Sequence, residues 1–221
     1  MMVKKYSILI GISILVCVCA QAQQSSHTSH TVQLTHYILD SFIPGKVKVK
    51  SGTVSDQLLN YNILTGEMIY TENGKFLAIS NPKDVDTVYI KERKFVPVGD
   101  TFYEVLTSTP APLYLEVTCT VSEPGAPVGF GMTSSTTASA SLRSLIQSGG
   151  AYGLKLPDNF QVVPKFNFLI FHEGKFQRAN NMQQLIKIFP AKKTQIKELA
   201  GKNNTNFSKR DDQIELITQI Q

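Results

Sequence analysis

The chain has 221 residues, of which 42% are hydrophobic, and it carries a formal net charge of +5. This length suits one domain, or one domain with a small appendage, and the apolar fraction is sufficient for a core. The charge excess is too small to favour a nucleic-acid partner, because nucleic-acid-binding proteins usually concentrate basic residues on one face.

Residues 1–22 have the parts of a secretory signal peptide. Lys4 and Lys5 form a positive start, and residues 6–20 are mostly apolar but short for a membrane span. Ala20 and Ala22 offer the small side chains that a signal peptidase accepts. We therefore expect cleavage before Gln23 and export to the periplasm, the outer membrane or the outside of the cell.

The cysteines leave few roles open. Cys17 and Cys19 raise lipidation as an alternative, but Val16 and Val18 precede them where a lipoprotein signal requires a small residue. After cleavage only Cys119 remains, so no intramolecular disulfide is expected. Cys119 alternates with apolar residues in a predicted strand and is interpreted as a small inward-facing residue rather than a nucleophile, which would need a basic neighbour.

Residues 23–35 are polar and are predicted to be a tail or a weakly held first strand. His27, His30 and His36 lie within ten residues, and neutral imidazoles are good metal ligands. No Cys or carboxylate cluster completes such a site, so no metal and no cofactor are predicted.

Residues 23–121 predict an antiparallel β-meander, because short alternating apolar runs are separated by turn residues. About eight strands are expected, and Pro97 should mark an edge strand or a strand end. The predicted strands are 37–42, 46–50, 58–64, 67–70, 75–80, 86–91, 95–96, 101–106 and 113–121. The predicted turns and breaks are Pro44-Gly45, Ser51-Gly52, Thr65-Gly66, Asn73-Gly74, Asn81-Pro82, Gly99-Asp100 and 110–112.

Residues 122–150 are rich in Gly, Ser, Thr, Ala and Pro and predict a long mobile loop. Gly129-Phe130-Gly131 lacks the Gly-Lys-Ser/Thr that follows in a phosphate-binding loop, so no phosphate site is expected there. Residues 151–179 return to strand patterns and should close the β-domain, with a hairpin turn at 172–175. His172 and Glu173 could be read as an acid–base pair, but an exposed turn offers no pocket, and no catalytic residue is predicted.

Residues 180–221 predict a cap of short helices, which need tertiary support. Asn181 should cap the first helix, and Pro190 should end or restart it. A second helix is expected over 191–200 with Gly201 as its stop, and a third from Ser208, with Asp211 completing a capping box. An apolar stripe should dock the cap: Leu185, Ile188, Phe189, Ile196, Leu199, Phe207, Ile214, Ile217 and Ile220. Ten Lys/Arg against five Asp/Glu from residue 165 onward make this end basic, so contact with an anionic membrane surface is a weaker alternative to a solvated face.

The predicted fold is therefore α+β and mainly β. The antiparallel meander is expected to curl into a partly open barrel or roll, with a small C-terminal helical cap, and two flat stacked sheets are the alternative.

Several segments resemble a family of exported, functionally uncharacterised proteins of bacteroidete-type bacteria. The segments are LLNYNILTGEM (58–68), AISNP (78–82), VDTVYI (85–90), FVPVGDTFYEVL (95–106) and 152–217. The resemblance implies a Gram-negative envelope setting, and it carries over no catalytic or binding residue.

The leading functional hypothesis is a non-enzymatic envelope protein that binds an envelope partner or a small apolar ligand, since a curled sheet can enclose a cavity. The alternatives are a hydrolase-like enzyme with a site assembled from separate strands, and a structural accessory subunit docked through the basic helices. A lined pocket or a contiguous apolar patch would support the first hypothesis, and an evenly polar surface would count against it.

Overall fold

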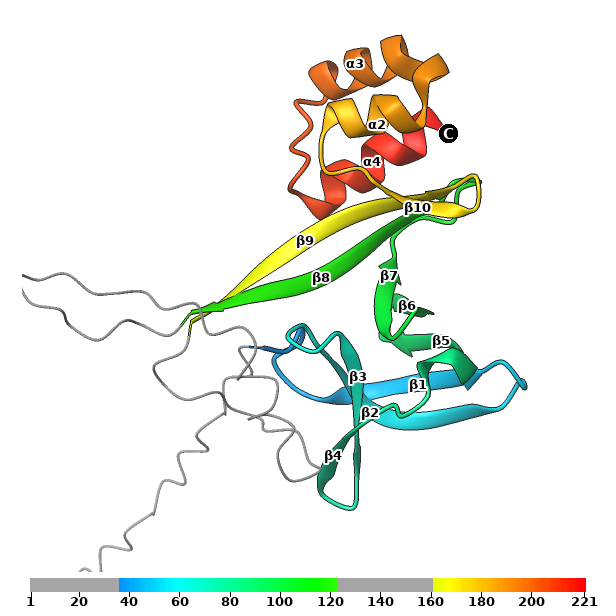
Figure 1. The fold of residues 1–221 in the computed structure, drawn as a ribbon, viewed down its shortest axis with the longest axis vertical. Helices are drawn as coiled ribbons and strands as arrows, with labels where there is room; N and C mark the ends of the chain where they lie inside the picture. The colour runs from blue at the N-terminus through cyan, green and yellow to red at the C-terminus, as the bar shows by residue number, and fades with distance from the viewer. Residues whose placement is uncertain (1–35, 123–160) are drawn as a thin grey trace, which may run out of the picture. The chain divides into compact units, whose positions relative to one another are not determined.

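The computed structural model describes residues 36–122 and 161–221 (Figure 1). Several predictions lie outside these residues: the signal peptide with Ala20 and Ala22, His27, His30, residues 123–150 of the loop, and the expected strand at 152–156.

Ten antiparallel strands form one sheet in the order β10-β9-β8-β7-β6-β5-β1-β2-β3-β4. Neighbours in this order are mostly neighbours in sequence, as a meander requires. The strands are β1 (Ile43–Val49), β2 (Val54–Asn62), β3 (Glu67–Glu72), β4 (Lys75–Ala78), β5 (Val85–Ile90), β6 (Arg93–Val98), β7 (Thr101–Val105), β8 (Leu113–Ser122), β9 (Gln161–His172) and β10 (Lys175–Arg178).

The meander is interrupted once. After β4, a short 3-10 turn (Pro82–Asp84) returns the chain to the far side of β1, so that β5 pairs with β1 instead of β4. The sheet therefore consists of two meanders, β1–β4 and β5–β10, which are joined along the β1–β5 ladder. This leaves β4 and β10 as the two edge strands.

The sheet curls upon itself without closing, which confirms the predicted partly open roll. β3 and β7 lie close to each other although four strands separate them in the sheet order. On the inner face, the Tyr61 hydroxyl of β2 donates to the Val117 carbonyl oxygen of β8 at 3.4 Å, and the Tyr61 ring stacks on Phe95. An added Cβ at Gly66 would lie 2.8 Å from the Thr101 side chain, which shows how closely the β2–β3 turn approaches the start of β7.

Even–odd alternation along the strands produces the core. In β8 the predicted inward set of Leu113, Leu115, Val117 and Val121 is buried, and Cys119 packs against the same core. The inner faces of the other strands add the large buried side chains Leu59, Tyr61, Met68, Ile90, Phe95, Phe102, Phe168 and Ile170.

Most predicted turns are confirmed. Asn73-Gly74 has positive φ at both residues, as a two-residue hairpin requires, and Glu173-Gly174 forms the same kind of turn between β9 and β10. Pro97 is the penultimate residue of β6, beyond the part of that strand that pairs with β5, so it marks a strand end.

Two predictions in the first part of the meander are wrong. Pro44-Gly45 lies inside β1 and not in a turn, because Gly45 pairs with Gln57 on one side and Ile90 on the other. The expected strand at 37–42 is absent apart from one bridge between Tyr37 and Asn62. This segment is held by two backbone hydrogen bonds, from Ile38 to Tyr61 and from Ile63 to His36, and by the Asn60 side-chain amide, which donates to the carbonyl oxygens of Leu39 and Ser41.

The predicted helical cap is confirmed as the helices α2 (Met182–Ile188), α3 (Lys193–Lys202) and α4 (Arg210–Ile220), with a 3-10 turn (Pro190–Lys192) between the first two. Asn181 caps α2 as expected, because its side-chain oxygen accepts a hydrogen bond from the Gln184 amide at 2.9 Å.

The other predicted helix boundaries need correction. Gly201 lies within α3, and Asn204 takes the left-handed conformation after its end. Ser208 and Asp211 do not form a capping box, since α4 begins at Arg210. Before this helix, the backbone amide of Asn206 donates a hydrogen bond to the Asp212 carboxylate. The backbone amide of Ser208 donates another to the side-chain oxygen of Asn206.

The cap docks through its apolar stripe and through a buried ion cluster. Leu185, Ile196, Ile217 and Ile220 are buried with the inner face of the sheet, and Figure 1 shows α2–α4 gathered beside β9 and β10. The Glu104 carboxylate of β7 is 1% exposed and accepts from the Arg93 guanidinium at 2.7 Å and from Arg210 of α4 at 2.9 Å. Within 36–122 and 161–221, no helix has the length and apolar character needed to cross a bilayer.

Candidate functional site

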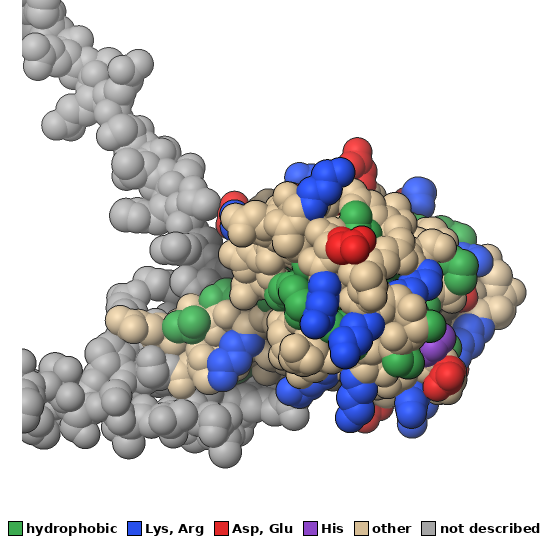
Figure 2. All heavy atoms as spheres, turned by 90° about the horizontal axis from the view of Figure 1, so that it is seen from above, with side chains coloured by type: hydrophobic (Ala, Val, Ile, Leu, Met, Phe, Trp, Pro, Cys, Tyr) green, Lys and Arg blue, Asp and Glu red, His purple; other side chains and the backbone are tan. Residues whose placement is uncertain are grey.

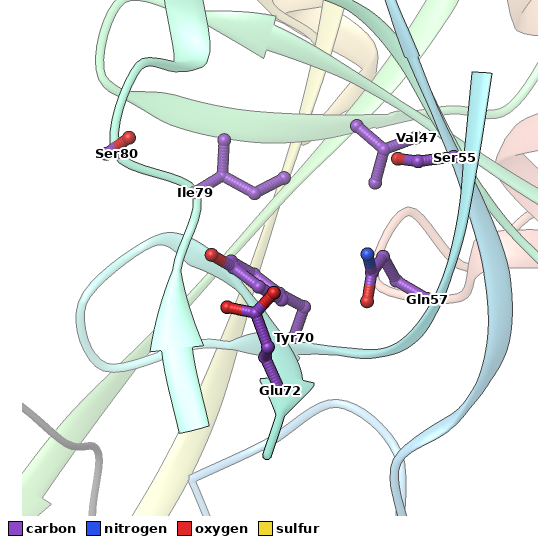
Figure 3. A pocket seen from close by; sticks show the side chains of 7 residues that line it. All are labelled: Val47, Ser55, Gln57, Tyr70, Glu72, Ile79 and Ser80. Carbon is purple, nitrogen blue, oxygen red and sulfur yellow. The ribbon is translucent and has the colours of Figure 1, made fainter. Parts of the chain in front are cut away.

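A concavity of about 270 Å³ lies on the inner face of the sheet beside β1, β2 and β3 (Figure 3). Its lining is mostly polar and comes from four separate segments of the chain. The lining residues are Val47, Ser55, Gln57, Tyr70, Glu72, Ile79 and Ser80. We call this site the mouth pocket.

The mouth pocket occupies the place where the inner face changes from apolar to polar. Along β2, Leu59 and Tyr61 belong to the buried core, whereas Gln57 and Ser55 continue the same face toward the start of the strand. Along β3, Met68 is buried, and Tyr70 and Glu72 follow it on the same face. The pocket is therefore an extension of the core face beyond the part that the roll fills.

The register of the strands brings the lining side chains together. Val47 of β1 lies opposite Ser55 of β2, and Tyr70 of β3 lies opposite Leu59 of β2. Ile79, directly after β4, is anchored by a hydrogen bond from its amide to the Met68 carbonyl oxygen at 3.0 Å. Gln57 and Ile79 project into the pocket from opposite sides, and the Tyr70 ring lies below Ile79 and next to Glu72 in this view (Figure 3).

The lining of the mouth pocket carries a single charge, which is negative. Glu72 is the only charged residue among the lining residues, and Lys75 lies directly opposite it in the β3–β4 ladder. Both side chains are exposed to water. The pocket thus offers one carboxylate, one amide, one phenol and two hydroxyl groups, beside the apolar side chains of Val47 and Ile79.

His172 and Glu173 do not form a catalytic pair in the described structure. The two side chains lie at the β9–β10 turn, with 3.9 Å between His172 Nε2 and Glu173 Oε1, which is too long for a hydrogen bond. The His172 ring packs instead on Phe189, with 5.1 Å between the ring centroids. Neither residue lines the mouth pocket.

Cys119 is half-buried, and burial raises the pKa of its thiol to about 11 from an ordinary value near 9, although Lys165 acts in the opposite direction. At pH 8 the thiolate fraction should therefore be about 100-fold lower than that of a free cysteine. We expect iodoacetamide to alkylate Cys119 at least that much more slowly, with a rate that rises as the pH approaches 11. Mass spectrometry of the Cys119 peptide would measure the rate, and full reactivity at pH 8 would contradict this picture.

The basic C-terminal end does not form a concentrated patch in the view of Figure 2. Lys and Arg side chains are distributed over that face, with acidic and apolar side chains between them. The described residues also hold no group of three or more His, Cys, Asp or Glu side chains that could bind a metal ion. His36 is buried, and its ring lies 4.5 Å from that of Tyr37.

No residue of the mouth pocket was predicted from the sequence as a site. The sequence pattern gave little indication of a site there, because Ser55 and Gln57 precede the apolar part of their strand and are typical of a solvated strand end. Convergence with Tyr70 and Ile79 depends on the β2–β3 register and on the return of the chain after β4.

No protein-family model, curated protein or solved structure matches this chain.

Proposed function

We propose that this protein is a non-enzymatic binding protein of the cell envelope, and that its ligand enters the mouth pocket. The observation that supports the proposal most is the convergence of five polar side chains at the open end of the core face: Ser55, Gln57, Tyr70, Glu72 and Ser80. Ligand sites often lie in the mouths of curled sheets, where a scaffold positions a few polar groups beside apolar surface.

The lining favours a small, neutral ligand that carries several hydroxyl or amide groups. An apolar ligand would leave the pocket's polar groups without partners, which is unfavourable when water is displaced. A phosphorylated or carboxylated ligand would be repelled by Glu72. The volume of about 270 Å³ is just below the range of roughly 300–1,000 Å³ for drug-sized ligands and suits a single sugar-like ring.

Each polar group has a role that follows from its chemistry. The Glu72 carboxylate accepts from hydroxyl groups, the Gln57 amide can both donate and accept, and the hydroxyls of Ser55 and Ser80 do the same. The Tyr70 ring supplies a flat apolar surface with a polar end. The apolar ligand that the curled sheet predicted is therefore replaced in our proposal by a polar one.

Ligand-observed NMR with N-acetylglucosamine and myo-inositol, both neutral, tests this proposal. We expect saturation transfer from the protein to at least one of the two compounds, and none to glucose 6-phosphate. The double variant Gln57→Ala, Glu72→Ala should weaken binding at least about 10-fold, because two hydrogen bonds, one of them charge-assisted, are lost.

Asp56→Asn is the matched control. Asp56 lies between Ser55 and Gln57 on the same strand, but it points to the opposite face, where it pairs with Lys46 at 2.6 Å. This variant should bind like the unmodified chain. Absence of transfer to both neutral compounds, or equal binding by the pocket variant, would refute the proposed ligand class.

A further inference from the structure

A second surface lies on the outer face of strands β7–β10, opposite the helical cap. It carries an aromatic group in which Phe176 contacts Tyr103, Tyr114 and Phe171, with ring centroids 5.0–5.4 Å apart. None of these four rings belongs to the described core cluster. Phe171 is 39% exposed, and the other three rings are half-buried. We call this surface the aromatic face.

The strand registers place cations at both ends of the aromatic face. One row of paired residues crosses five strands from Lys94 through Val105, Tyr114 and Leu169 to Arg178. Lys94 and Arg178 are exposed, and the residues between them are apolar or aromatic. Lys165 adds a third exposed cation to the same face, since it pairs with Thr118 on β8.

The one acidic side chain on the described part of this face, Glu116, accepts hydrogen bonds from two neighbouring side chains. The Glu116 carboxylate accepts a hydrogen bond from the Tyr103 hydroxyl at 3.3 Å and another from the Asn167 amide at 3.0 Å. Asn167 in turn accepts from the Asn180 amide at 3.4 Å. Both donors are neutral, so Glu116 keeps its negative charge, and the aromatic face carries three cations, Lys94, Lys165 and Arg178, against this one carboxylate.

We propose that the aromatic face docks the protein onto an anionic lipid surface. Three cations around aromatic and apolar side chains complement a negatively charged interface, where Tyr and Phe occupy the headgroup region and each nearby Lys or Arg adds attraction. The mouth pocket and two neighbouring concavities involve β1–β5 and the segment after β4, whereas no residue of the aromatic face lines them.

A second copy of the chain fits less well. Stacking this face on itself would set cationic ends against cationic ends, because Lys94 and Arg178 lie at opposite ends of one row. Like charges that face each other across an interface oppose association. An acidic protein surface has the same charge complementarity, and the experiment below separates it from lipid.

Sedimentation with vesicles tests the proposal, using protein recovered from the periplasm of an exporting bacterial host. One set of vesicles contains equal parts of phosphatidylglycerol and phosphatidylcholine, and the other contains phosphatidylcholine alone. We expect binding to the anionic set only, with a strong decrease when the salt concentration rises from about 0.1 M to about 1 M. The double variant Lys94→Gln, Arg178→Gln should weaken binding about 25-fold, at about 5-fold for each charge removed.

Matched variants locate the effect. The double variant Lys197→Gln, Lys202→Gln removes the same amount of charge from exposed positions on α3. Its affinity for the anionic vesicles should differ from that of the unmodified chain by less than about 3-fold, because salt screens distant charges. Phe171→Ser should weaken binding about 5-fold through lost apolar contact, whereas Phe166→Ser on the opposite face of β9 should not.

Three results would overturn the proposal. The first is sedimentation that does not differ between the two sets of vesicles. If neither set bound the protein, an acidic protein surface would be the better partner for the aromatic face. The second is an equal loss in the α3 variant, which would assign the binding to the helical cap. The third is equal loss in Phe166→Ser and Phe171→Ser. Circular dichroism of each variant would show that the fold is retained.

Discussion

Replacing Glu104 with alanine is expected to lower the free energy of unfolding by about 3 kcal/mol, because it leaves two guanidinium groups without their shared carboxylate. Glu104 is 1% exposed and binds Arg93 through two hydrogen bonds of 3.0 and 2.7 Å. Arg210 reaches the same carboxylate from α4, 106 residues away in sequence. The side chains of Arg93 and Arg210 are 26% and 46% exposed, so partial hydration keeps the loss at the lower end of the usual range for a broken buried pair.

Urea denaturation would measure this loss, and hydrogen exchange would show where it acts. Because Arg210 links α4 to β7, Glu104→Ala should increase the exchange rate of the α4 amides more than that of the β8 amides. Glu116→Ala is the matched control, since Glu116 is a half-buried carboxylate on the neighbouring strand with neutral hydrogen-bond donors, and about 1 kcal/mol is expected. A loss below about 1 kcal/mol in Glu104→Ala would contradict a structural role for the ion cluster.

The ion cluster also shows what sequence patterns can and cannot predict here. In residues 101–106, Phe102 and Glu104 fall on the same face, so a carboxylate on an apolar face was visible in the sequence. A buried carboxylate requires a cationic partner, but the sequence around Glu104 does not indicate that Arg210, more than 100 residues away, is one of its partners. The Arg210 contact depends on how the helical cap docks.

Local patterns predicted the local structure well. The alternation in residues 113–121 gives the buried face of β8, Asn73-Gly74 gives a hairpin turn, and Asn181 gives a helix cap. These features depend on residues within a few positions of one another, where strand geometry and turn conformations decide the outcome.

Both proposed binding surfaces depend on pairing between distant segments. The mouth pocket needs the return of the chain after β4 to β1, and the aromatic face needs the β8–β9 ladder, whose strands are separated by residues 123–160. Strand order at such separations is set by the assembled sheet and not by a local signal. The sequence could therefore indicate a curled sheet without indicating where its surface would bind.

Gly45→Ala is expected to destabilise the fold by about 3 kcal/mol, through overpacking at the β1–β5 ladder. A Cβ added at Gly45 would lie 2.5 Å from the Tyr89 carbonyl oxygen and 2.8 Å from Leu59 Cδ1. The carbonyl belongs to the paired strand β5, and Leu59 is fully buried, so neither atom can move without disturbing the sheet. The Pro44-Gly45 pair that resembles a turn is thus a point of close approach between strands.

Gly201→Ala separates this effect from the general consequences of replacing glycine. Gly201 lies within α3, and an added Cβ there would meet no atom within 4 Å, so alanine should stabilise the protein by about 0.5–1 kcal/mol. The midpoints of thermal and urea unfolding should therefore fall in Gly45→Ala and rise in Gly201→Ala. If Gly45→Ala unfolded like the unmodified chain, β5 would not lie as close to β1 as the ladder requires, and the junction of the two meanders would need another arrangement.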